Sequence, residues 1–133
     1  MNPWFKYTLY TTTALLMVSG ILYAVPIYAD KWFFVDIQPF VSGSTLMAIH
    51  GLFAMLMWFV AGLFVASHVG LRLKGNSKLL SGMTNLTLLV TLGVTGYLLY
   101  YGQGIEFTEW VADCHTLLGV MFLLVLIGHR LRY

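Results

Sequence analysis

Charged residues fall in five short groups along this chain, and long uncharged apolar stretches separate the groups. About 20 apolar residues of helix cross a hydrocarbon core of roughly 30 Å, so each stretch is long enough to span a membrane. Only 9% of the 133 residues are charged and the mean hydropathy is +0.83. Soluble domains carry roughly 25% charged residues. The charged groups are Lys6; Asp30, Lys31 and Asp36; Arg72, Lys74 and Lys78; Glu106, Glu109 and Asp113; and Arg130 with Arg132.

We therefore predict an all-α membrane protein: a four-transmembrane-helix bundle that forms a single domain over residues 1–133. A spanning segment must satisfy its backbone within lipid, and uniformly apolar runs favour helices over barrel strands. The predicted helices cover about residues 6–27, 43–72, 79–101 and 110–131. No internal repeat is apparent between them.

The distribution of basic residues predicts the orientation. The loop from Arg72 to Lys78 and the C-terminal tail are basic, whereas the loop from Glu106 to Asp113 is acidic. Basic loops face the cytoplasm, so both termini are expected to be cytoplasmic. The first apolar stretch, from Tyr7 to Tyr28, exceeds the roughly 7–15 residues of a signal-peptide core, and we interpret it as the first span.

Two classes of function are excluded. The seven basic residues form no continuous basic surface, so the pattern argues against nucleic-acid binding. The apolar spans predict membrane lipid as the surroundings of the chain. A single cysteine, Cys114, cannot form an intrachain disulfide or the Cys-x-x-Cys-His attachment site of a c-type heme.

All four histidines lie on two of the predicted helices: His50 and His68 on the second, His115 and His129 on the fourth. A helical residue advances by about 100°, so both members of each pair fall on one helix face. In the predicted topology both helices run from outside to inside. His50 and His115 should therefore lie near the outer surface, and His68 and His129 near the inner one.

This pattern predicts two non-covalent b-type hemes, with His50 and His115 on the outer iron and His68 and His129 on the inner iron. Heme iron held by two imidazoles has no open position and changes redox state with little rearrangement. At about 1.5 Å per residue the histidines are separated by roughly 27 Å on one helix and roughly 21 Å on the other. Helix tilt, or ligands set at unequal heights, must absorb the difference of about 6 Å.

Other residues complete the predicted sites. Heme propionates are anions that need cationic partners, and Arg72 and Arg130 are the candidates at the inner heme. Small residues between the histidines, such as Ala61 and Gly119, would let a porphyrin lie close to the backbone. Gly93 to Gly96 is interpreted as a packing notch. A quinone is a further candidate ligand, beside the outer acids Glu106, Glu109 and Asp113 or the inner residues Asn76, Ser77, Lys78 and Asn85.

Alternative interpretations remain open at this point. A lone histidine between helices is often only a hydrogen-bonded packing residue. Histidine pairs could also bind zinc or copper, although such sites usually need a third or fourth ligand. The chain could then be a heme-free membrane anchor, a small-metal carrier or a proton-conducting subunit that uses the histidines as a relay.

With Gly51 after one histidine and Gly128 before another, the chain resembles the small four-helix di-heme cytochrome b subunits of bacterial membrane oxidoreductases. That class serves formate dehydrogenases, hydrogenases and similar complexes. The likeness covers roughly residues 43–133 and rests on topology and histidine placement, without a signature string. The resemblance implies a place in the bacterial inner membrane. It also implies electron exchange between a quinone or periplasmic redox protein and a catalytic partner subunit, whose identity the sequence does not specify.

Overall fold

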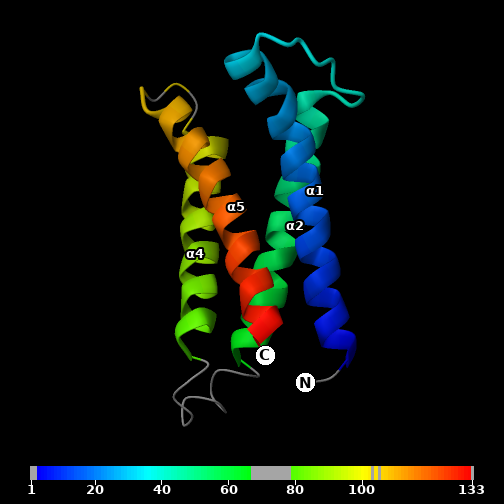
Figure 1. Ribbon diagram of the computed structural model, residues 1–133, viewed down its shortest axis with the longest axis vertical. Helices are drawn as coiled ribbons and strands as arrows, with labels where there is room; N and C mark the ends of the chain where they lie inside the picture. Colours follow the sequence, from blue (N-terminus) through cyan, green and yellow to red (C-terminus); the bar gives the residue numbers. More distant parts are fainter. Residues whose placement is uncertain (1–2, 67–78, 103, 105, 133) are drawn as a thin grey trace. The chain divides into compact units, whose positions relative to one another are not determined.

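The computed structural model describes residues 3–66, 79–102, 104 and 106–132. Within them the chain is helical apart from short connections (Figure 1). The helices are α1 (Pro3–Phe33), α2 (Gly43–Phe64), α4 (Leu79–Tyr101) and α5 (Thr108–Arg132). Four segments are long and apolar enough to cross a membrane: Pro3–Phe33, Gly43–Phe64, Gly82–Tyr101 and Thr108–Leu131. The prediction of an all-helical protein with four helices able to span a membrane is confirmed by their length and composition.

Two compact units make up the chain, Met1–Gly70 and Leu71–Tyr133. In the first unit α1 packs against α2, and in the second α4 packs against α5. Each unit is an antiparallel helix hairpin and is described by itself.

The end of α1 differs from the prediction, because the helix continues to Phe33 instead of ending near residue 27. Pro26 lies inside it, and the charges of Asp30 and Lys31 do not stop it. Phe34 ends the helix by adopting a left-handed conformation, with φ of 55°. Its N–H donates to the Asp30 carbonyl at 3.1 Å, a helix stop in which glycine is the usual residue.

The other helix bounds lie close to the predicted ones. α2 begins at Gly43, where the Ser42 hydroxyl caps it by accepting from the Thr45 N–H at 3.3 Å. Most of its predicted extension to residue 72 lies outside the described residues. α4 has the predicted bounds, and α5 begins slightly earlier than predicted, at Thr108.

Small hydroxyl residues of α1 form its buried face against α2. Thr12, Thr13 and Ser19 are each no more than 4% exposed. The Thr13 hydroxyl donates to the Leu9 carbonyl at 2.8 Å and also lies 3.8 Å from Sδ of Met57 on α2. Small residues of this kind let membrane helices approach closely, and bonds to their own helix satisfy the hydroxyls.

Candidate functional site

His50 lies on α2 and contacts α1 through one ring nitrogen. Its Nδ1 is 3.1 Å from Ser19 Oγ and 3.2 Å from the Leu16 carbonyl oxygen. A carbonyl oxygen can only accept, so this contact requires the proton of the neutral ring on Nδ1. The lone pair then lies on Nε2.

A glycine on α1 makes room for this ring. A Cβ added at Gly20 would lie 3.0 Å from His50 Cε1 and 3.3 Å from Nδ1, closer than side-chain carbons normally approach. Ser19 and Gly20 therefore act together, because the serine bonds the ring and the glycine leaves space for it.

His115 lies on α5 in a corresponding arrangement with α4. Its Nδ1 is 2.7 Å from Thr95 Oγ1. The Thr95 hydroxyl also reaches two carbonyls of its own helix, Thr91 at 3.0 Å and Leu92 at 3.1 Å. A Cβ at Gly96 would lie 3.4 Å from His115 Cε1. A hydroxyl residue followed by glycine thus contacts the histidine in this hairpin as well.

The correspondence extends to positions along the helices. His50 and His115 are each the eighth residue of their helix, counted from Gly43 and Thr108. Ser19 and Thr95 are each the seventeenth, counted from Pro3 and Leu79. We call each Ser/Thr–Gly pair and its histidine a histidine notch. The two hairpins repeat this construction, a repeat that the sequence analysis did not find.

The remaining predicted site residues are placed less completely. His129 is half-buried on α5, and the neighbouring Arg130 is exposed. His68 and Arg72 lie outside the described residues, as do Lys74, Lys78, Asn76 and Ser77. The predicted inner pair is therefore represented in the structure by His129 alone.

The helix faces between the histidines differ from each other. Ala61 and Met57 of α2 are buried, at 8% and 3% exposure, in the hairpin where α2 packs on α1. On α5, a Cβ at Gly119 would meet nothing within 4 Å in the described part of the chain. Of the two small residues expected to leave space for a porphyrin, Gly119 has open space beside it and Ala61 does not.

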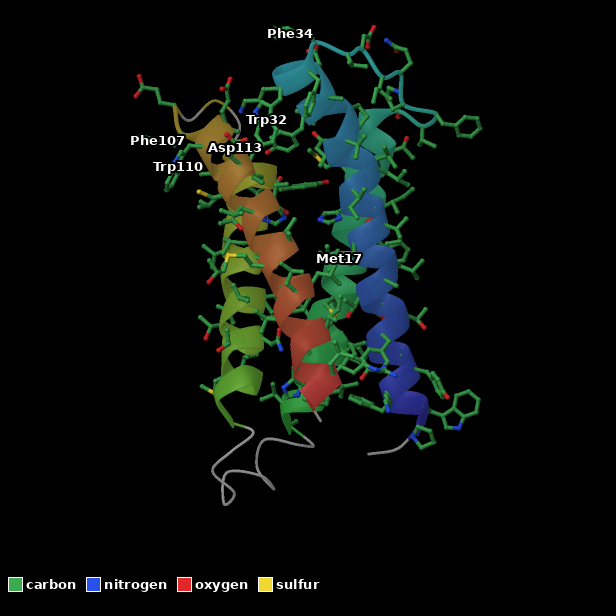
Figure 2. The ribbon with its side chains drawn as sticks, in the orientation of Figure 1. Met17, Trp32, Phe34, Phe107, Trp110 and Asp113 are labelled. Carbon is green, nitrogen blue, oxygen red and sulfur yellow. The ribbon has the colours of Figure 1, made fainter. Side chains whose placement is uncertain are left out.

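Charged and aromatic side chains gather at the start of α5. Phe107, just before the helix, and Trp110, in its first turn, are 65% and 69% exposed, and Asp113 follows one turn further (Figure 2). Glu106 and Glu109 are exposed beside them. Glu109 lies in the first helical turn, where the helix dipole favours a negative charge.

Three observations concern the alternative interpretations and the candidate quinone residues. No group of three or more His, Cys, Asp or Glu residues that could hold a metal ion occurs among the residues described. Cys114 is a half-buried free thiol. On α4 the buried Oδ1 of Asn85 has no hydrogen-bond partner within the described ranges. Such a group ordinarily calls for water or a ligand.

Comparison with known proteins adds no relative: no protein-family model, curated protein or solved structure matches this chain. The two histidine notches are therefore the main ground for a functional proposal.

Proposed function

We propose that this chain is a di-heme b-type cytochrome subunit that relays electrons across a membrane, between a quinone pool or redox protein and a partner oxidoreductase. One observation carries the proposal. His50 and His115 occupy the same position in two equivalent hairpins, and a hydroxyl from the adjacent helix contacts Nδ1 of each. Two equivalent imidazoles are what a bis-histidine site requires.

The donor set fits the group. A metal-bound histidine usually gives its other ring N–H to an oxygen, which fixes the tautomer and the ring orientation. The Leu16 carbonyl enforces this tautomer at His50, and Thr95 can accept the same bond at His115 because its own proton can go to a helix carbonyl. His50 and His115 would hold one heme, and His68 and His129 the other. A bound heme supplies a one-electron iron couple with no open coordination position.

The chain's own residues set the depth of the ligands and compensate charge. His115 and His129 are 14 residues apart on α5, which corresponds to about 21 Å along the helix and most of a hydrocarbon core of roughly 30 Å. Arg130, exposed beside His129, and Arg72 are the proposed partners of propionates at that end.

The proposal includes an orientation and partners. The membrane is the bacterial inner membrane, as the resemblance to di-heme cytochrome b subunits implies, and both termini face the cytoplasm, as the basic loops indicate. The cluster of Phe107, Trp110, Glu106 and Glu109 then faces the periplasm. Exposed aromatic and acidic side chains suit a periplasmic or membrane redox subunit with basic groups, or a quinone beside a proton acceptor.

Absorption spectroscopy tests the proposal. The detergent-purified chain, produced with heme supplied, should give a reduced-minus-oxidised b-type spectrum and about two hemes per chain by pyridine hemochrome. His50→Ala and His115→Ala should each remove the same heme, and His129→Ala should remove the other. Met55→Ala, at an exposed position of α2, serves as the control and should keep both.

Retention of both hemes in His50→Ala would contradict the pairing. A folded, colourless protein would contradict the function and leave three alternatives. Stoichiometric zinc or copper would identify a small-metal carrier, and proton flux in vesicles without a Soret band would identify a proton-conducting subunit. If the protein showed neither bound metal nor proton flux, a membrane anchor would be the remaining alternative.

A further inference from the structure

We infer that Ser19 and Thr95 are positioning residues for the two histidines, each accepting a hydrogen bond from Nδ1–H so that Nε2 presents its lone pair to iron. The inference rests on the proposed function, since it names residues that act on the ligands of the proposed outer heme. It concerns side chains that the sequence analysis did not assign to the site.

Each hydroxyl group can accept the bond from the imidazole, because its own proton has an acceptor on its own helix. The Ser19 hydroxyl can donate to the Leu16 carbonyl at 2.9 Å, and the Thr95 hydroxyl can donate to the Thr91 carbonyl at 3.0 Å. A hydroxyl has one proton, so a hydroxyl that donates to its own helix turns a lone pair towards the imidazole. Ser19 is 4% exposed, and the bonds of its hydroxyl to the Leu16 carbonyl and to His50 lower the free-energy cost of burying it in an apolar interface.

The neighbouring glycines restrict the ring. Cε1 of His50 would be 3.0 Å from a Cβ at Gly20, and Cε1 of His115 would be 3.4 Å from a Cβ at Gly96. Each ring therefore lies against the backbone of the first helix while its Nδ1 is bonded to that helix. Contact on one ring side and a bond at one nitrogen together restrict the plane of each ring, and at His50 the Leu16 carbonyl also fixes the tautomer.

A hydrogen bond from Nδ1–H makes the imidazole a stronger donor and stabilises ferric over ferrous iron. Loss of the bond should therefore raise the midpoint potential. The contact of Thr95 is shorter than that of Ser19, 2.7 Å against 3.1 Å. At His50 the Leu16 carbonyl, 3.2 Å away, still accepts when the serine hydroxyl is removed. The larger effect is expected at Thr95.

The test is a redox titration with ferric EPR spectra on the heme-loaded full chain. Thr95→Val keeps the side-chain shape and removes the hydroxyl. It should retain both hemes, raise the potential of one of them and shift its low-spin g values. The expected change is about tenfold in the ferric-to-ferrous ratio, or about 59 mV for one electron. Ser19→Ala should act on the same heme in the same direction, by less.

Matched variants distinguish positioning from packing. Thr95→Ser keeps the hydroxyl and should restore the wild-type potential. Thr91→Val, one turn away on α4, and Thr12→Val, buried on α1, should leave both potentials unchanged. If Thr95→Val loses heme, retention of heme by Thr95→Ser supports the inference, and loss in both variants overturns it.

Different results would overturn the di-heme function and the positioning role of Ser19 and Thr95. Two hemes in the wild type, with potentials and g values unchanged in Thr95→Val and Ser19→Ala, would overturn the positioning role and leave the di-heme function standing. Absence of heme from the folded wild type would overturn the function, and the positioning role with it.

Discussion

Glycines 20 and 96 differ in how closely an added methyl group would approach the neighbouring imidazole. In Gly20→Ala the Cβ would be 3.0 Å from His50 Cε1, so the ring must move. We expect this variant to hold the proposed outer heme less tightly and to gain no helix stability. Gly96→Ala, with 3.4 Å to His115 Cε1, should have a smaller effect. Heme content and thermal unfolding by circular dichroism measure both.

Gly51→Ala is the matched control, because its Cβ would meet nothing within 4 Å in the described part of the chain. It should be neutral or stabilising by up to about 1 kcal/mol, the helix preference for alanine over glycine. Equal heme content and equal thermal stability of Gly20→Ala and Gly51→Ala would show that the space at Gly20 does not restrict the His50 ring.

The sequence pattern marks the histidines as candidate site residues, whereas it gives no indication of Ser19 and Thr95. Four histidines confined to two apolar segments form an unusual pattern, since ionisable groups are costly in membranes. Hydroxyl–glycine pairs are ordinary packing residues there. Their role depends on which residue of the next helix lies opposite, and the apolar pattern does not specify that register. The spacing gives no signal either, since Ser19 precedes His50 by 31 residues and Thr95 precedes His115 by 20.

At the scale of the helix, Phe34 strains the end of α1. Its φ of 55° is unfavourable for a residue with a side chain, by about 1 kcal/mol or more. Phe34→Gly should relieve this strain, while Phe40→Gly, at an exposed position without positive φ, should only add flexibility to the unfolded chain. The free energy of unfolding should therefore be about 1 kcal/mol higher in the first variant than in the second. Chemical denaturation in detergent would show the difference, and equal stability would contradict the strain.

Packing within the first hairpin gives a second prediction at this scale. Met57 is 3% exposed and contacts Thr13, whereas Met55 is 67% exposed on the same helix. Met57→Ala should destabilise the hairpin by about 2 kcal/mol or more because it leaves a cavity. Met55→Ala should change stability little. A similar decrease in unfolding temperature in the two variants would contradict the assignment of the Met57 face of α2 to the interface with α1.

Helix bounds were predictable where composition changes at the boundary. α4 has the predicted bounds because a turn sequence precedes Leu79 and a glycine follows Tyr101. The end of α1 was missed because the charges of Asp30 and Lys31 indicated an earlier end than the backbone stop at Phe34. A left-handed phenylalanine has no signal in the sequence, since glycine normally occupies that position.

At the scale of the whole molecule, the basic residues predict the orientation in the membrane. A fluorescent protein that folds only in the cytoplasm should be bright when fused after Tyr133 and dark when inserted at Gln38. Alkaline phosphatase, active only outside, should give the reverse pattern. The reason is the excess of lysine and arginine in the loop before α4 and in the tail. Phosphatase activity at the C-terminus would contradict the proposed topology.

Both parts of each histidine notch belong to one hairpin, and this has a consequence for biogenesis. Synthesis from the N-terminus completes α1 and α2 before α5 exists, so the contacts that orient His50 can form early. The contacts that orient His115 follow within the second hairpin. Under the proposed function, a heme that binds after both hairpins have formed would meet rings that are already ordered, and its binding would not have to overcome their rotational freedom.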